Sequence, residues 1–155
     1  MKEPSRFANL VQKLTICTIT LSNDHELLET LQSVQEQDAS PYMVIIKDGQ
    51  VRRPPDFLDH FSFPILHISE SDAGIYDAMN QALRHVQTDY VVFLNSGDRL
   101  HSISSLSWCA KVLDHHLSRG CCADVFLFPW YRKYSAHKYC PSLAVLKFNH
   151  QSAIY

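Results

Sequence analysis

The sequence predicts an α/β fold in which a mostly parallel sheet carries helices on both faces. The predicted strands are apolar along their whole length instead of alternating, which is typical of strands buried on both sides. Segments with apolar residues at helical spacing separate these strands, as expected when helices connect parallel strands. The chain has 155 residues, 46% hydrophobic and 19% charged, which is enough for one domain with its own core.

The first predicted strand covers residues 14–20 (LTICTIT), a run rich in β-branched residues. It ends at a Ser-Asn-Asp cluster that can cap a helix, and leucines at helical spacing follow. We therefore predict a helix over residues 24–37. A second apolar strand over residues 42–46 then leads into a Lys-Asp-Gly turn.

The rest of the chain continues the same alternation of strands and helices. Its predicted elements are a loop over 50–60 with one helical turn around Phe57, a strand over 64–68, a helix over 75–86, a strand over 90–94, a serine-capped helix over 102–117, a strand over 124–128 and a strand over 143–148. We interpret residues 1–13 as an N-terminal extension and residues 14–155 as one domain.

Charge and cysteine content exclude several classes of protein. The formal net charge is −2, whereas nucleic-acid binders are usually clearly basic, so we expect no nucleic-acid partner. Five cysteines, no CxxC pair and no apolar leader in residues 1–13 favour reduced thiols in a cytoplasmic protein. No apolar run approaches the roughly 20 residues of a membrane span, so we expect a protein that is soluble or peripheral to a membrane.

Polar residues follow three of the predicted strands at their carboxyl ends. The first strand leads to Thr20 and Asn23, the second to Asp48, and the fourth to Asn95 and Asp98. Ligands of open α/β sheets bind at this edge, so these side chains are candidates for a binding site. The first strand–helix turn lacks a GxGxxG motif, which argues against a dinucleotide site.

Each candidate has a functional and a structural interpretation. Asp98, after a Ser-Gly pair, can bind a hard divalent cation that holds phosphate oxygens, or it can hydrogen-bond its own turn. Asp48 can accept hydrogen bonds from a base or ribose, or form an ordinary Asp-Gly turn. Thr20 and Asn23 can contact a nucleotide or cap the next helix. Asn80 can tie its helix to the Asp98 loop or face solvent.

Five segments, taken together and in order, resemble the inverting GT-A glycosyltransferases of family 2. They are LTICTITLSND, LLETLQSVQEQ, VIIKDG, ISESDAGIYDAMNQAL and TDYVVFLNSGDRL. The chain is most similar to bacterial members of the colanic-acid-biosynthesis type, which build capsule, lipopolysaccharide O-antigen or exopolysaccharide. The resemblance runs from Leu14 to Arg99 and returns weakly at the terminal NHQSAIY.

The resemblance implies a GT-A (Rossmann-like) nucleotide-diphospho-sugar transferase fold, incomplete at its C-terminus. It implies a UDP- or GDP-sugar donor, a saccharide or lipid-linked acceptor, and Mn²⁺ or Mg²⁺ as cofactor. It also implies a cytoplasmic location, at the inner face of the membrane if the acceptor is lipid-linked. Thr20 matches the family's first-strand position at the nucleoside, and Asp48 matches the strand-two Asp at the base. Asn80 matches an Asn in the helix before the metal motif. Asn95 through Asp98 stand in place of the DxD-type motif, with Asp98 at its final, metal-binding position.

Two departures from the family pattern affect these expectations. Residues 50–55 (QVRRPP) replace the usual Gly/Ser/Thr/Asp run, so this loop must differ. The carboxylate that acts as catalytic base is expected beyond Tyr155, so no catalytic residue is assigned. One alternative is therefore a truncated, non-catalytic remnant or binding module that keeps the nucleotide-sugar half. Another is a nucleotidyltransferase, against which the absence of a Gly-rich basic phosphate loop counts.

Overall fold

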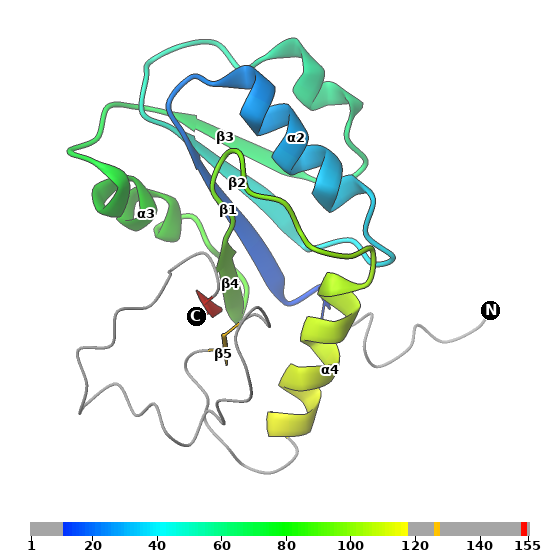
Figure 1. Cartoon of the computed structure of the whole chain (residues 1–155). Helices are drawn as coiled ribbons and strands as arrows, with labels where there is room; N and C mark the ends of the chain where they lie inside the picture. The colour runs from blue at the N-terminus through cyan, green and yellow to red at the C-terminus, as the bar shows by residue number, and fades with distance from the viewer. Residues whose placement is uncertain (1–10, 118–125, 128–152, 155) are drawn as a thin grey trace.

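A computed structural model describes residues 11–117, 126–127 and 153–154 (Figure 1). Its strands are β1 (Leu14–Thr20), β2 (Met43–Asp48), β3 (Ile65–Ser69), β4 (Tyr90–Phe93), β5 (Phe126–Leu127) and β6 (Ala153–Ile154). Its helices are α2 (Asp24–Gln35), the 3-10 helix η1 (Asp56–His60), α3 (Ile75–Leu83) and α4 (Ser105–Leu117). The strand predicted over 143–148 lies outside the described residues, and β6 was not predicted.

The strands form one sheet in the order β3-β2-β1-β4-β6-β5. The first four strands are parallel, β6 runs antiparallel to β4, and β5 runs antiparallel to β6. The mostly parallel sheet predicted from the sequence is therefore confirmed. The register places Thr20 opposite Asp48, and Asp48 opposite Ser69, so the carboxyl ends of three strands meet at one edge.

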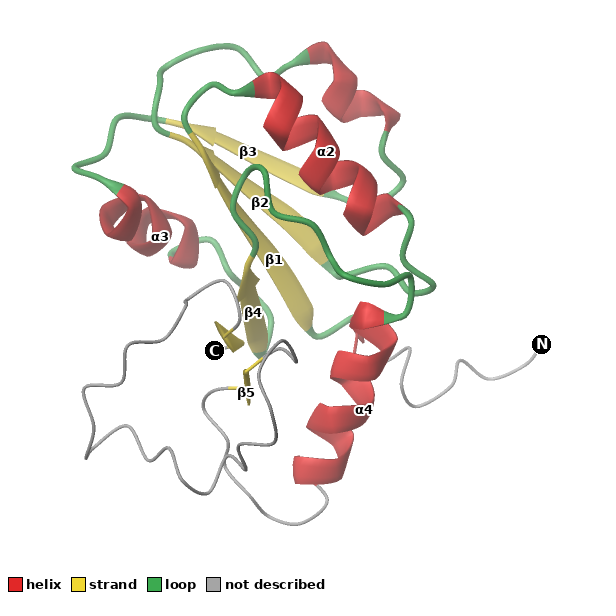
Figure 2. Ribbon diagram, viewed as in Figure 1, coloured by secondary structure: helices red, strands yellow, loops and turns green. Residues whose placement is uncertain are grey.

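Helices cover both faces of the sheet, as predicted (Figure 2). Residues of α2, η1 and α4 pack with Leu14 and Ile16 into one apolar cluster. Met79 and Ala82 of α3 pack with Cys17 into a second cluster on the opposite face. Neighbouring residues of β1 thus point to opposite layers, as the pleat of a strand requires. Within the described part of the chain, no helix is both long and apolar enough to cross a membrane.

The helices are shorter than their sequence patterns predict. The start of α4 moves from the predicted Ser102 to Ser105, because Ser102 and Ser105 form a turn of their own. In this turn the Ser105 amide donates to the Ser102 carbonyl at 3.1 Å, and the Ser102 amide donates to Ser105 Oγ at 3.0 Å. Serine hydroxyls compete with helical hydrogen bonds in this way, so periodicity alone does not locate the helix start.

Candidate functional site

A pocket of about 480 Å³ lies at the carboxyl ends of β1 and β4. α2 leaves β1 toward one face of the sheet, and α3 covers the other face, so a hollow remains where the two helices begin. The residues that line the pocket are Ile19, Thr20, Leu21, Asn23, Glu26, Asp72, Gly74, Ile75, Ala78, Asn95 and Ser96. The pocket thus brings together three of the predicted site residues, Thr20, Asn23 and Asn95.

Two hydroxyl groups in this pocket are buried without a hydrogen-bond partner among the described residues. They are Thr20 Oγ1, on a side chain only 5% exposed, and Ser96 Oγ. Most buried polar side-chain atoms in proteins are hydrogen-bonded to protein or to ordered water. Protein atoms cover both hydroxyls, so a polar ligand in the pocket would reach them only after a local shift of the pocket wall.

Asn23 caps α2 and also lines the pocket. Its side-chain oxygen accepts a hydrogen bond from the Glu26 amide at 3.3 Å, so Asn23 is the N-cap of α2. It also lines the pocket, which places the first turn of α2 at the pocket wall. The capping interpretation is confirmed, and contact with a nucleotide stays a prediction.

Backbone amides of the loop from Asn95 to Asp98 donate hydrogen bonds to β1 and to α2. The Ser96 amide donates to the Ile19 carbonyl at 3.0 Å, and the Gly97 amide donates to Thr30 Oγ1 at 2.9 Å. Gly97 has φ 91°, a left-handed conformation that favours glycine. The Asp98 amide closes the turn by donating to the Asn95 carbonyl at 3.0 Å.

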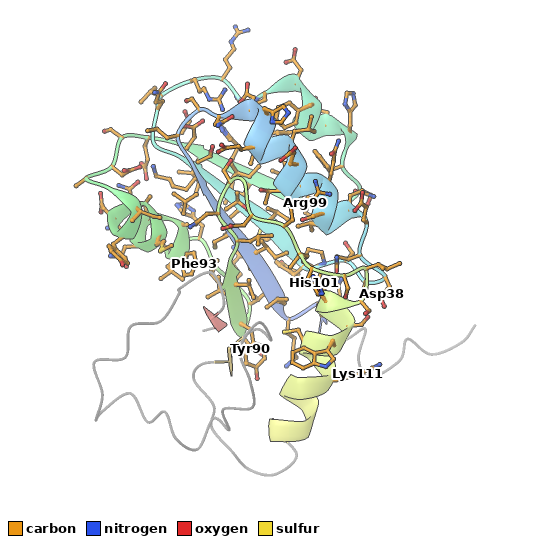
Figure 3. The ribbon with its side chains drawn as sticks, viewed as in Figure 1. Asp38, Tyr90, Phe93, Arg99, His101 and Lys111 are labelled. Carbon is orange, nitrogen blue, oxygen red and sulfur yellow. The ribbon has the colours of Figure 1, made fainter. Side chains whose placement is uncertain are left out.

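The Asp98 side chain is partly exposed and is not one of the groups that line the pocket. It immediately follows the pocket residues Asn95 and Ser96. Arg99 and His101 come next, in the loop that leads from β4 to α4 (Figure 3). Asp98 therefore stands beside the pocket, and its role as a metal ligand stays a prediction.

A divalent cation at this loop would have Asp98 as its protein carboxylate and would need further ligands from a bound phosphate or from water. In the described part of the chain, no group of three or more His, Cys, Asp or Glu side chains could hold a metal ion by itself. The Glu26 carboxyl group lies near this loop, since a Cβ placed on Gly97 would be 3.5 Å from its carboxyl carbon. Mg²⁺ is usually bound by one or two carboxylates with phosphates and water as further ligands, and Mn²⁺ also prefers oxygen ligands.

The Asp48 side chain is fully buried and does not line the pocket. It accepts hydrogen bonds from the amide and hydroxyl of Ser22, the amide of Gln50 and Nε of Arg52. Burial by itself would raise the pKa of Asp48, but the hydrogen bonds from Gln50, Arg52 and Ser22 outweigh it and lower the pKa below its ordinary value. Asp48 is thus an ionised carboxylate with its own set of internal donors.

Lys47 was not predicted as part of the site. Its side chain is fully buried, and its ammonium group donates to the Asp48 carbonyl at 3.0 Å, the Glu70 carbonyl at 2.5 Å and Asp72 Oδ2 at 3.0 Å. The hydrogen bond from Lys47 lowers the pKa of Asp72, which lines the pocket. Lys47 therefore holds Asp72 in place at one wall of the pocket. In the sequence, the one sign of this role was the position of a lysine at the end of an apolar strand.

Asn80 lies on an exposed part of α3 and does not line the pocket. Of its two interpretations, the structure favours the one in which it faces solvent. Instead, α3 contributes Ile75 and Ala78 to the pocket, preceded by Gly74, whose φ of 122° favours glycine. A nucleotide contact by Asn80 stays a prediction.

Comparison with known proteins identifies the class. The model of glycosyl transferase family 2 matches residues 15–148, so the chain belongs to this family. No curated protein gives a significant match.

Solved structures show the same fold. Staphylococcus aureus TarS 1-349 has 18% sequence identity and a TM-score of 0.60, over 79% of this chain and 38% of TarS. Its complex with UDP-GlcNAc gives a TM-score of 0.62 at 17% identity, over 92% of this chain and 44% of TarS. The Pyrobaculum calidifontis mannosyltransferase PcManGT, in complex with GDP-Man and Mn²⁺, has 20% identity and a TM-score of 0.52, over 61% of this chain and 30% of PcManGT. The fold is GT-A, and the chain spans less than half the length of these neighbours.

Proposed function

We propose that this chain binds a nucleotide-diphospho-sugar, with UDP or GDP as the nucleotide, as the donor part of an inverting glycosyltransferase. The observation that carries the proposal is the pocket at the carboxyl ends of β1 and β4, which Thr20, Asn23, Asn95 and Ser96 line, with the Asp98 loop beside it. Two structural neighbours are described in complexes with UDP-GlcNAc and with GDP-Man and Mn²⁺, which supports this donor class.

The charges of the pocket support metal-dependent binding. The described residues that line it include Glu26 and Asp72 but no lysine, arginine or histidine. The Lys47 ammonium group already offsets the charge of Asp72, so it is the Glu26 carboxylate that would repel an anionic diphosphate unless a cation lay nearby. A Mn²⁺ or Mg²⁺ ion at Asp98, when bound, would neutralise the charge on the leaving nucleotide diphosphate.

The residues of this chain then have separate roles. Thr20 and Ser96 offer hydroxyls to the ribose or phosphates, Asn23 and Asn95 offer amide groups, and Asp98 holds the cation. No residue is assigned as the base that deprotonates the acceptor hydroxyl. We propose a saccharide or lipid-linked acceptor in bacterial surface polysaccharide synthesis of the colanic-acid type. A cytoplasmic location, with peripheral association at the inner membrane face, is part of the same proposal.

Calorimetric titration tests the proposal. UDP and GDP are titrated into the wild-type chain, Asp98→Ala and the control Asp56→Ala, each with and without Mn²⁺. Asp56 is an exposed acid of η1, away from the pocket lining. We expect Mn²⁺-dependent binding of one nucleotide that is lost in Asp98→Ala and kept in Asp56→Ala. Absence of binding by a folded wild-type chain would contradict the proposed function.

A further inference from the structure

Glu26 brings a carboxylate to the pocket that no other described residue neutralises. It lies in the first turn of α2, its side chain is exposed, and it lines the pocket. Within the described part of the chain, its carboxylate takes part in no ion pair and accepts no hydrogen bond. Glu26 therefore presents its negative charge to the pocket and to the solvent in it.

The other acid of the pocket lining, Asp72, has its charge offset inside the protein. Its Oδ2 lies 3.0 Å from the ammonium group of Lys47, whose side chain is fully buried. Its Oδ1 accepts a hydrogen bond from the Gly74 amide at 3.0 Å. Of the two acids that line the pocket among the described residues, only Glu26 thus lacks a cationic partner there.

The Glu26 carboxylate is held against the loop that carries Asp98. This loop passes beside α2 (Figure 1), and the Gly97 amide donates to the Glu26 carbonyl at 3.3 Å. A Cβ placed on Gly97 would lie 3.5 Å from Glu26 Oε2, so the carboxylate borders the Gly97 backbone. The Asn23 cap fixes the turn of α2 from which Glu26 projects. Glu26 therefore stands between the pocket and the residue that precedes Asp98.

We propose that Glu26 makes donor binding depend on the cation, because it admits the nucleotide diphosphate to the pocket only as its metal complex. A metal-free diphosphate brings further negative charge beside an unpaired carboxylate, whereas a bound Mn²⁺ or Mg²⁺ offsets that charge and is itself attracted by Glu26. This inference rests on the proposed function, because it requires a nucleotide diphosphate to enter this pocket.

The size of the effect follows from Coulomb's law. Two like charges about 8 Å apart, at an effective dielectric constant of roughly 20 and in physiological salt, repel enough to weaken binding roughly tenfold. Removing the charge of Glu26 should therefore raise the metal-free affinity for UDP or GDP by about that factor. Salt screens the repulsion, so this gain should shrink as the ionic strength rises.

The experiment is calorimetric titration of UDP and GDP, with EDTA in one series and Mn²⁺ in the other. The proteins are the wild-type chain, Glu26→Gln, Glu26→Asp and the control Glu29→Gln, which removes the same charge from the second turn of α2, outside the pocket lining. Glutamine keeps the size of the side chain and suits the first turn of a helix, and circular dichroism confirms that each variant is folded.

We expect metal-free binding to tighten in Glu26→Gln, while its affinity with Mn²⁺ stays at or below that of the wild type. The ratio of the two affinities, which measures the dependence on the metal, should therefore fall in this variant. Glu26→Asp keeps the charge, and Glu29→Gln keeps the pocket, so both should depend on Mn²⁺ as strongly as the wild type.

The outcomes separate this inference from the proposed function. If the wild type binds a nucleotide with Mn²⁺ and Glu26→Gln depends on Mn²⁺ just as strongly, the inference is refuted while the donor site stands. An equal gain in Glu29→Gln would also refute it, because a general loss of negative charge would then explain both. Loss of the metal dependence in Glu26→Asp would refute it as well, because charge at this position would then not set the dependence. If neither the wild type nor Glu26→Gln binds a nucleotide, with or without Mn²⁺, the donor site is refuted together with the inference.

Discussion

Replacing Lys47 by methionine removes a buried ammonium group while keeping a side chain of similar length. The ammonium donates to the Asp48 and Glu70 carbonyls and to Asp72, and the Lys47 side chain has 0% exposure. Breaking a buried ion pair by removing one partner costs about 3–5 kcal/mol. The Asp72 side chain is 14% exposed and can turn toward water, so we expect the lower end, about 3 kcal/mol.

Urea unfolding of the full chain measures this loss. At a slope of about 2 kcal/mol per molar, the midpoint should fall by about 1.5 M with no change in slope. Lys13→Met is the matched control, because Lys13 pairs with Asp89 at 2.8 Å between side chains that are 54% and 61% exposed. Surface pairs of this kind contribute little, so the control midpoint should barely move.

The partner substitution adds a second check on Lys47. Adding Asp72→Asn to Lys47→Met removes the carboxylate left without its cation, so the double variant should recover part of the lost stability. A midpoint drop in Lys47→Met no larger than in Lys13→Met would refute the conclusion that Lys47 holds this edge of the sheet together. Full additivity of Lys47→Met and Asp72→Asn would refute the ion pair.

Other predictions concern the core, the thiols and pH. Leu31→Ala, at a fully buried position, should cost about 2–5 kcal/mol in urea unfolding, whereas Ile103→Ala, at a residue 66% exposed, should cost under about 0.5 kcal/mol. Burial raises the pKa of Cys17 and of Cys109 to about 12, so iodoacetamide at neutral pH should label neither in the folded chain, as mass spectrometry of the peptides will show. The pKa of Asp48 is lowered by folding, so its contribution to stability is present above the unfolded value of about 4 and is lost as pH falls through the folded value. Thermal unfolding between neutral and acidic pH should show this loss, and Asp48→Asn should flatten that part of the profile.

The sheet and its helices were predictable because their signals are local. Four apolar runs matched β1 to β4 within a few residues, since strands covered on both faces must be apolar throughout. Helix ends were less predictable, because side-chain hydrogen bonds set them. Gln37, for example, bonds through its side chain to the Ser33 and Ser102 carbonyls after α2 has ended at Gln35.

Only those site residues whose location follows from the order of strands in a parallel sheet could be predicted from the sequence. Thr20, Asn23 and Asn95 follow strands whose carboxyl ends must meet, so their convergence follows from topology. The partners of Lys47 and Arg52 lie up to 28 residues away, and only the folded chain brings them together. The loop over 50–55 was expected to differ from the family pattern, but the sequence did not show that Arg52 would bind Asp48.

The most direct test of the donor site is to map where the nucleotide binds. Amide chemical shifts of the isotope-labelled chain would be followed by NMR during titration with UDP, and separately with GDP, in the presence of Mg²⁺. We predict that the largest shifts fall on residues 19–23 and 95–98, around the pocket, and that they vanish without Mg²⁺. The amide of Gln35, roughly 18 Å away at the far end of α2, should not shift. Shifts centred away from the carboxyl ends of β1 and β4, or shifts independent of Mg²⁺, would contradict the proposed donor site.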